Sequence, residues 1–260
     1  MTTLPIKTPF AAPVFFEAVV SSTMTVSCEL AAQGYPHGTV IVADFQEAGR
    51  GRIHERTWEM EKGKSLAFTL LLRYSEIPRA LTLRAGLAVC LAIEDFFPVL
   101  KGRVRIKWPN DIMADSKKIC GIITEADAGT ARVGIGVNVA QTTFPPHLQH
   151  KAASVSLASG ADIDPQARFA LLELILSGIF AELHESCDAA ADNGAIGWRS
   201  RIEDRLYKKG GRAAFIQGAA ESGLLIKGTL LGIGNDGELL LLPEGADRPE
   251  AFFSGELLAY

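Results

Sequence analysis

A segment rich in glycine and arginine between two apolar runs constrains the fold of this chain more than any other feature. The runs cover residues 39–43 and 66–72, and the segment between them contains Gly49-Arg50-Gly51-Arg52. Short apolar runs bounded by turn residues predict buried strands. Glycine lets the backbone approach a ligand closely, and arginine offers forked donors that match phosphate or carboxylate oxygens. The segment is therefore either a ligand-binding loop between two strands or a mobile, solvated surface loop.

Residues 1–207 alternate strand and helix patterns and predict an α+β domain. Ser22 and Thr23 precede a helical stretch and suit its cap, because a hydroxyl oxygen there accepts a free backbone N–H. Residues 141–151 contain Pro145-Pro146 and predict an irregular loop. The expected strands, besides the two apolar runs, are Val14–Val20, Val104–Lys107, Lys118–Glu125 and Arg132–Val139, and the expected helices are Met24–Gln33, Pro78–Phe97, Asp164–Glu185 and Ile196–Leu206.

The pattern changes at Lys208-Lys209-Gly210-Gly211. Beyond it, short β-like runs alternate with turn residues, which is typical of a small β-barrel. The chain is therefore expected to divide into a main domain, 1–207, and a small all-β domain, 208–260. The β-like runs are 213–216, 224–231, 238–242 and 251–253.

Composition excludes several classes of protein. The chain has 26 Lys plus Arg and 30 Asp plus Glu, a net charge of −4, whereas proteins that bind nucleic acid usually carry a basic excess. No apolar run approaches the roughly 20 residues that span a bilayer, and no signal peptide is evident. The widely spaced cysteines, which form no Cys-x-x-Cys pair, disfavour a metal cage or disulfide framework and favour the reducing cytoplasm. They are Cys28, Cys90, Cys120 and Cys187, of which Cys90 is expected to be a small buried hydrophobe.

A second informative stretch is Lys107-Trp108-Pro109-Asn110-Asp111. A lysine at the end of a strand, followed by a rigid turn, holds a compact positive charge on a fixed platform. The alternatives are plainer. Lys107 would be an exposed strand end, Trp108 a core residue, and Asn110 and Asp111 would bond the backbone of their own turn.

Taken together, the motifs resemble those of biotin–protein ligases. Besides the Gly/Arg segment after Ala43–Gln46 and the Lys107 stretch, the resemblance rests on Lys118–Glu125 and on Gly134–Val139. The tail is also similar to the small carboxy-terminal domain of these enzymes, in Lys227-Gly228, 235–239 and Ser254-Gly255-Glu256. The resemblance spans nearly the whole chain and implies an α+β fold. In that fold a mixed central sheet flanked by helices, like that of class II aminoacyl-tRNA synthetases, carries a small SH3-like β-barrel at the carboxy terminus.

The resemblance implies a two-step reaction with ATP and biotin as substrates and Mg²⁺ as the cation that screens the triphosphate. The biotin carboxylate attacks the α-phosphate, giving biotinyl-5′-adenylate and pyrophosphate. A lysine amine of a biotin carboxyl carrier protein then attacks the mixed anhydride and releases AMP. Such chemistry needs positioning and stabilisation of charge more than a protein nucleophile. The sequence offers fixed cations for it and no evident nucleophile–base pair.

Carried over by motif position, the resemblance implies three overlapping sets of site residues. The expected catalytic cations are Arg50, Arg52 and Lys107. Biotin would be bound by Ser22, Thr23, Met24, Gln46, Arg50, Gly51, Arg52 and Lys107. The nucleotide would be bound by Gly49, Arg50, Gly51, Arg52, Trp58, Lys107, Asn110 and Asn138. The sequence names no ligands for a metal.

Three departures from the family pattern are visible. Met24 stands where many relatives have an asparagine, so a hydrogen bond from that side chain is absent. The segment Arg52–Trp58 is less basic than in relatives and one residue longer, and its His54 is expected to be solvated. The chain begins almost at the first strand of the catalytic domain, so no DNA-binding helix-turn-helix and no repression of transcription are expected.

Two other functions remain open. A lipoate ligase shares the fold, but its relatives carry a different loop, so biotin is favoured over lipoate. A non-catalytic binder of biotin or adenylate would fit the altered loop, but Gln46, both arginines and Lys107 are retained. A homodimer is also open, because some relatives pair through an edge of the main sheet.

Overall fold

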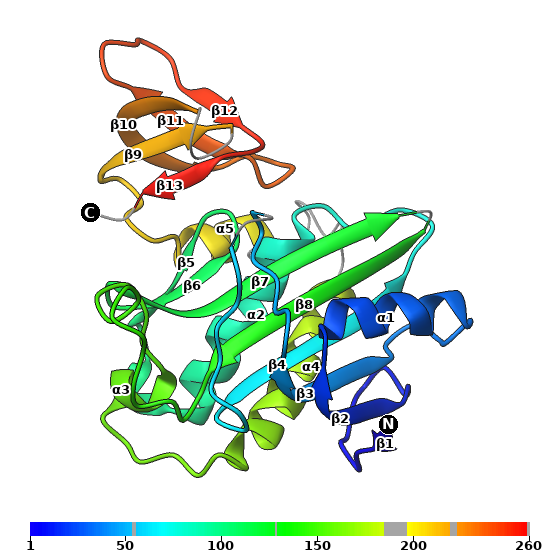
Figure 1. Cartoon of the computed structure of the whole chain (residues 1–260). Helices are drawn as coiled ribbons and strands as arrows, with labels where there is room; N and C mark the ends of the chain where they lie inside the picture. The colour runs from blue at the N-terminus through cyan, green and yellow to red at the C-terminus, as the bar shows by residue number, and fades with distance from the viewer. Residues whose placement is uncertain (54–55, 128, 185–196, 219–222, 259–260) are drawn as a thin grey trace.

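The chain forms two β-sheets joined by a short helical connection (Figure 1). The computed structural model describes residues 1–53, 56–127, 129–184, 197–218 and 223–258. The first sheet has eight strands and the second has five. The α+β class and the separate all-β tail expected from the sequence are confirmed.

The main sheet is mixed, with the strand order β1-β2-β3-β4-β8-β7-β6-β5. Strands β2 and β3 are parallel, and every other neighbouring pair is antiparallel. The parallel pair requires a crossover, which helix α1 supplies. The strands are β1 (Thr2–Thr3), β2 (Val14–Val20), β3 (Val40–Gln46), β4 (Ser65–Arg73), β5 (Val104–Lys107), β6 (Asp111–Ala114), β7 (Lys117–Asp127) and β8 (Thr130–Asn138).

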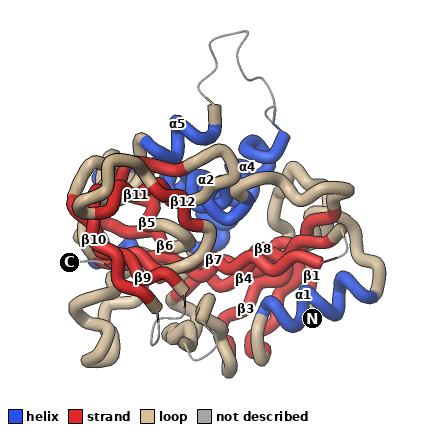
Figure 2. The backbone as a smooth tube through the Cα atoms, turned by 90° about the horizontal axis from the view of Figure 1, so that it is seen from above, coloured by secondary structure: helices blue, strands red, loops and turns tan. Residues whose placement is uncertain are grey.

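Helices cover both faces of this sheet (Figure 2). The long helices α2 and α4 lie on one face, and α1 lies on the other. Strand β4 is consequently buried along nearly its whole length, which explains why it has apolar residues at consecutive positions. The helices are α1 (Thr23–Ala32), α2 (Leu81–Phe96), α3 (Val155–Ser159), α4 (Ala167–His184) and α5 (Trp198–Glu203), with a 3₁₀ turn at Pro98–Leu100.

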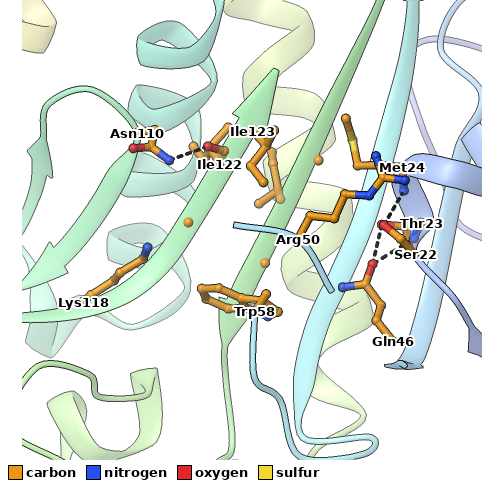
Figure 3. Close-up of a pocket in the computed structure, with 14 residues that line it drawn as sticks. Ser22, Thr23, Met24, Gln46, Arg50, Trp58, Asn110, Lys118, Ile122 and Ile123 are labelled. Atoms are coloured by element: carbon orange, nitrogen blue, oxygen red, sulfur yellow. Dashed lines mark hydrogen bonds between the residues drawn. The ribbon is translucent and has the colours of Figure 1, made fainter. Parts of the chain in front are cut away.

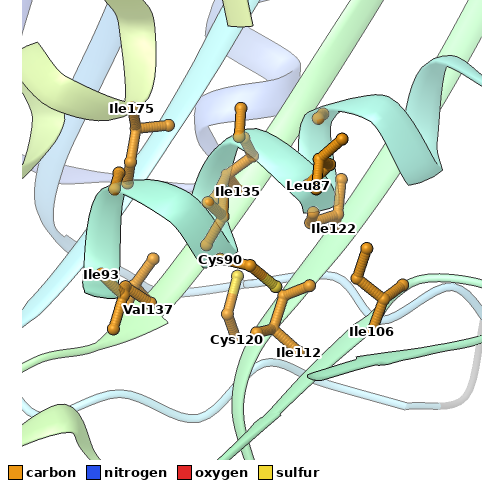
Figure 4. Close-up of a cluster of buried hydrophobic side chains, with 14 of the residues drawn as sticks. Leu87, Cys90, Ile93, Ile106, Ile112, Cys120, Ile122, Ile135, Val137 and Ile175 are labelled. Atoms are coloured by element: carbon orange, nitrogen blue, oxygen red, sulfur yellow. The ribbon is translucent and has the colours of Figure 1, made fainter. Parts of the chain in front are cut away.

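The core between α2 and the sheet is made of branched aliphatic side chains (Figure 4). Cys90 of α2 is fully buried in it, and burial raises the pKa of its thiol far above the ordinary value. Cys90 is thus an inert apolar filler, as expected. The helices α2 and α4 approach closely where Gly178 faces Ala88, because a Cβ at Gly178 would lie 3.2 Å from the Ala88 Cβ. Cys187 lies outside the described residues.

The carboxy-terminal sheet is wholly antiparallel, in the order β12-β11-β10-β9-β13. Trp108 joins it to the main sheet, because its indole Nε1 donates to Gly237 O at 2.9 Å and its ring lies 5.9 Å from that of Phe215. Trp108 is therefore a core residue, the plainer of its two expected roles. The strands are β9 (Arg212–Gln217), β10 (Leu224–Ile233), β11 (Leu239–Pro243), β12 (Glu250–Phe252) and β13 (Glu256–Leu258).

Two local predictions need correction. Asp111 is not part of the turn after Lys107, because it begins β6 and pairs with Lys107 across a hairpin. The helix expected from Asp164 begins at Ala167, because the Asp164 carboxylate accepts the Gln166 N–H and forms a turn before the helix.

Candidate binding groove and its charged rim

A groove on the α1 face of the main sheet brings together most of the residues expected to bind biotin (Figure 3). The groove and the solvent-open space at its mouth together amount to about 460 Å³. Its lining comes from the start of α1, β3, the Gly/Arg segment, the turn between β5 and β6, β7 and β8. The lining residues are Ser22, Thr23, Met24, Gln46, Arg50, Trp58, Asn110, Lys118, Gly121, Ile122, Ile123, Gly134, Ile135 and Gly136.

Glycines form the floor of the groove. A Cβ at Gly136 would lie 2.6 Å from the Trp58 ring, and a Cβ at Gly134 would lie 2.7 Å from the Met24 Sδ. Side chains at these positions would fill the space over the sheet. The Gly-Ile-Gly motif of β8 therefore opens one face of the strand, while Ile135 packs into the core on the other.

A hydrogen-bonded cluster closes one end of the groove. The Gln46 Oε1 accepts the Thr23 backbone N–H at 2.8 Å and the Thr23 hydroxyl at 3.0 Å. Thr69 of β4 in turn donates to the Thr23 Oγ1 at 2.9 Å. Ser22 caps α1 by accepting the Met24 N–H, and it also lines the groove, so both roles weighed for it are observed. With its oxygen engaged, Gln46 has its amide Nε2 available as a donor to a ligand.

The Gly/Arg segment folds back on itself as a narrow hairpin, residues 49–58, named here the Gly/Arg hairpin. Gly51 N donates to Arg56 O at 2.7 Å, Trp58 N donates to Gly49 O at 2.9 Å, and Arg50 forms a β-bridge with Thr57. A Cβ at Gly49 or Gly51 would lie within 2.7 Å of a carbonyl oxygen on the opposite side. The glycines thus permit the close approach of the two sides. His54 lies outside the described residues.

The two arginines of the hairpin point in different directions. Arg50 lines the groove, where it donates to the Thr25 hydroxyl at 2.9 Å and lies 3.6 Å from Glu125. Arg52 is turned toward the carboxy-terminal sheet, where it donates to Gly255 O at 2.9 Å. Arg56, beyond the tip, forms two 2.8 Å hydrogen bonds to the Glu256 carboxylate.

The cation that lines the groove beside Trp58 is Lys118, not Lys107. The Lys118 ammonium lies 2.6 Å from the Asp111 carboxylate and 5.6 Å from the centre of the Trp58 ring. Lys107 lies outside the lining, in the electrostatic field of Asp111, Glu256, Lys118 and Arg56, and burial is the main cause that lowers the pKa of its amine. Lys118 is the first residue of the motif Lys118–Glu125. Its place in that motif, on a strand beside the hairpin that carries Trp58, is the signal by which it could have been recognised as a groove residue.

Trp58 lies in the middle of the groove, over Gly121 and Gly136. Its indole Nε1 is buried and, among the described residues, has no hydrogen-bond partner. An unsatisfied buried donor is costly, so this group is available to an acceptor atom that enters the groove.

The two asparagines expected near the nucleotide are placed differently. Asn110 lines the groove and donates to Ile122 O at 2.8 Å, so it fastens the hairpin of β5 and β6 to β7 rather than bonding its own turn. Asn138 is buried outside the lining and donates to Ala153 O at 3.0 Å, while its Oδ1 has no partner among the described residues.

A second pocket of about 630 Å³ adjoins the groove and shares Asn110, Ile122 and Ile123 with it. Arg52 and the exposed Phe253 of the carboxy-terminal sheet line this second pocket. Of the three expected catalytic cations, Arg50 lines the groove, Arg52 lines the neighbouring pocket, and Lys107 lines neither.

Two further observations concern the described residues as a whole. They contain no cluster of three or more acidic, histidine or cysteine side chains suited to a metal ion. They also contain no helix with the length and apolar character needed to cross a membrane.

Residues 16–140 match the family described as the biotin/lipoate A/B protein ligase family. The bifunctional ligase/repressor BirA of Bacillus spizizenii is 42% identical over 160 residues, covering 57% of this chain and 48% of that protein. The chain thus spans about half the length of this relative. The biotin–[acetyl-CoA-carboxylase] ligase of Mycobacterium tuberculosis is 31% identical over 199 residues, covering 71% of this chain and 73% of that protein.

Among solved structures, the biotin protein ligase of Aquifex aeolicus in complex with biotin and ATP is similar, with a TM-score of 0.76 and 27% identity. The match covers 94% of this chain and 97% of the Aquifex chain, and so includes the carboxy-terminal sheet. The groove, the order of the motifs and these similarities agree, and this chain belongs to the biotin/lipoate A/B protein ligase family.

Proposed function

We propose that this protein is an ATP-dependent biotin–protein ligase that forms biotinyl-5′-adenylate and transfers biotin to a lysine of a biotin carboxyl carrier protein. The observation that carries the proposal is the groove. It has a polar end at Thr23 and Gln46, a glycine floor under Trp58, and a cation at Lys118. A bicyclic urea with an aliphatic carboxylate arm has the matching sequence of polar, apolar and anionic parts.

The polar end of the groove would bind the ring system. The Gln46 Nε2 donates to a ligand oxygen, while Thr23 fixes the amide orientation. Ser22 and Met24 border the same end, and the carboxylate arm would run beside Trp58 toward Lys118. Such a site orients the carboxylate for attack on the α-phosphate, which is the main requirement of this reaction.

Cations stabilise the charge that develops on the phosphate oxygens during transfer. Lys118 is the lysine that we assign to contact the carboxylate and the α-phosphate, and Lys107 acts on it only through its charge, which interacts with Asp111 and Lys118. Arg50 and Arg52, with Gly49 and Gly51 between them, would close over the adenylate. Arg52 donates to Gly255 O, so this closure requires Arg52 to exchange a carbonyl oxygen for a phosphate oxygen. Asn110 and Asn138 would border the nucleotide.

Mg²⁺ enters this proposal as the counter-ion of ATP. The described residues offer no acidic cluster, and the Asp111 carboxylate already pairs with Lys118. Because Mg²⁺ often binds through substrate phosphates and water, a protein cage is not required. Every step assigned above to a residue of this chain is independent of the metal's ligands.

The assay that tests the function uses the full chain with Mg²⁺, ATP, labelled biotin or labelled lipoate, and a carrier domain. Transfer of biotin label, and no transfer of lipoate label, is the expected result. Label from lipoate alone would identify a lipoate ligase. Tight biotin binding without adenylate or transfer would identify a non-catalytic binder.

The division of labour between domains is part of the proposal. The main domain, 1–207, holds the groove, and the small domain, 208–260, contributes Gly255 and Glu256 to the arginines of the hairpin. The carrier protein is the macromolecular partner, and the reaction belongs in the cytoplasm, where carrier and ATP meet. A homodimer through the edge strand of the main sheet is compatible with this arrangement, and sedimentation of the full chain tests it.

A further inference from the structure

Gln46 and Trp58, which line the groove, belong to a segment that separates from strand β4 before strand β3 ends. Strand β3 pairs with β4 only as far as Ala43, which lies opposite Ala67. Its last residues, including Gln46, pair with β2 alone. At the edge of β3 where β4 no longer pairs, Asp44 O accepts the Gly63 N–H at 3.1 Å. Asp44 and Gly63 thus form a narrow neck, at which the chain leaves the sheet and returns to it.

One buried arginine of α4 bridges both sides of that neck. The Arg168 Nη2 donates to the Asp44 Oδ1 at 2.6 Å, and its Nη1 donates to Gly63 O at 2.6 Å and to Pro165 O at 2.8 Å. The Arg168 side chain is 5% exposed, and its guanidinium lies 4.4 Å from the centre of the Phe169 ring. Arg168 does not line the groove.

We propose that Arg168 is a positioning residue that closes the base of residues 44–63 and thereby holds Gln46 and Trp58 in register across the groove. This inference rests on the proposed function and names a residue that acts on the ligand through others. Gln46 follows Asp44 by two residues, and Trp58 lies on the irregular segment that leads back to Gly63. A shift at the neck therefore reaches both ligand-facing side chains.

The forked shape of the guanidinium suits this task. Arginine can donate to a carboxylate and to two carbonyl oxygens from fixed directions, whereas lysine offers a single ammonium. Buried ion pairs contribute little net stability, so stability alone does not account for a charge at this place. Without Arg168, the Gly63–Asp44 backbone bond would be the one direct link across the neck among the described residues, and ligand binding would then have to order a segment that Arg168 otherwise holds.

The test compares Arg168→Ala with Arg201→Ala as a matched control. Arg201 of α5 pairs with Glu182 of α4, the helix that also carries Arg168. Neither Arg201 nor Glu182 lines the groove. The dissociation constant of biotin is measured by calorimetry on the full chain without ATP, alongside urea unfolding of both variants. We expect Arg168→Ala to raise the biotin Kd roughly ten- to hundredfold, because small misplacements of a positioned site have effects of that order. Arg168→Lys should recover part of this loss, and Arg201→Ala should leave Kd within about twofold of the unmodified chain.

A second readout needs no ligand. Hydrogen exchange at the Gly51 and Trp58 amides reports whether the Gly/Arg hairpin stays closed, because both amides are bonded within it. Arg168→Ala should speed their exchange at least about tenfold, while Arg201→Ala should not. If Arg168→Ala does not fold, Asp44→Ala serves instead, because it removes the carboxylate that accepts the Arg168 Nη2 hydrogen bond and should change both readouts in the same direction.

Equal biotin Kd values in Arg168→Ala and Arg201→Ala, or unchanged amide exchange in a folded Arg168→Ala or Asp44→Ala, would overturn the inference. A failure of the proposed function looks different. In that case the unmodified chain itself binds no biotin, while the exchange measurement still decides whether Arg168 closes the neck.

Discussion

The guanidinium of Arg56 and the carboxylate of Glu256 form two hydrogen bonds of 2.8 Å that join the Gly/Arg hairpin to strand β13. Burial raises the pKa of the Glu256 carboxyl, but the hydrogen bonds and charge of Arg56 outweigh burial and hold the pKa below its ordinary value. The same pair raises the pKa of Arg56. The carboxy-terminal sheet is therefore fastened to the hairpin at the rim of the groove.

Glu256→Gln should lower the free energy of unfolding by about 0.5–1 kcal/mol at pH 7, a small value because the Arg56 side chain is 53% exposed. The folded-state pKa of Glu256 is lowered, so its contribution is complete above the ordinary value of 4.5 and is lost as pH falls through the folded-state pKa. Urea unfolding of both proteins at pH 7 and at stepwise lower pH measures this difference, which should shrink below about pH 4.5.

Glu250→Gln is the matched control for that experiment. Glu250 lies exposed on β12, away from the contacts of the hairpin. Glu250→Gln changes the net charge by the same amount as Glu256→Gln. Its unfolding free energy should stay within about 0.5 kcal/mol of the unmodified chain. A pH-independent gap between Glu256→Gln and the unmodified chain would contradict the assignment.

Lys118→Ala should lower the rate of adenylate formation by about 10²–10³-fold, because it removes the cation that lines the groove beside the reacting atoms. Lys107→Ala should have a smaller effect, since Lys107 acts on the groove only through its field at Asp111 and Lys118. Pyrophosphate release from ATP and biotin in single turnovers measures both rates.

Lys117→Ala provides the comparison for Lys118→Ala. The Lys117 ammonium donates to Gln149 O and points away from the groove, so its loss should leave the rate within about twofold. If Lys107→Ala lost as much activity as Lys118→Ala, then Lys107 would be the lysine in contact with substrate, as the sequence motif implied.

Gly136→Ala should displace Trp58, because the added Cβ would lie 2.6 Å from its ring. Overpacking of this kind costs about 1–3 kcal/mol of stability. We also expect weaker biotin binding, by about tenfold or more, since the new methyl group stands on the groove floor. Thermal unfolding and calorimetry measure the two effects.

A smaller ring should relieve the clash, so Trp58→Phe combined with Gly136→Ala should recover part of the lost stability. Gly197→Ala is the control, because no atom of the described residues lies within 4 Å of a Cβ at Gly197. Equal stability of Gly136→Ala and Gly197→Ala would mean that Trp58 does not rest on the floor.

Local patterns predicted the strands around the Gly/Arg segment and the start of α1, whereas the residues at the polar end of the groove were implied only by the resemblance to biotin–protein ligases. Apolar runs identified β3 and β4, and the cap signal at Ser22 located the start of α1. The direction of each cation was not predictable, because it depends on partners far along the chain. Arg52 bonds a carbonyl 203 residues away, and Lys118 rather than Lys107 lines the groove because β6 and β7 set their register. The hydrogen bond between Arg168 and Asp44 joins residues 124 apart in the chain, and no local sequence pattern predicts it.

Arg52→Ala tests whether the hairpin closes over the adenylate. The Arg52 Nη2 donates to Gly255 O at 2.9 Å, a neutral acceptor that a phosphate oxygen can replace. Charge-assisted bonds to phosphate are about twice as strong as neutral ones, so the exchange favours the closed state. Arg52→Ala should therefore shorten the half-life of bound biotinyl-adenylate by about tenfold or more, measured as the release of labelled adenylate into excess unlabelled biotin and ATP. Arg52→Lys keeps the charge but not the fork and should give an intermediate half-life. An unchanged half-life in Arg52→Ala would restrict this arginine to fastening the carboxy-terminal sheet, and adenylate retention would then rest on Arg50 and Lys118.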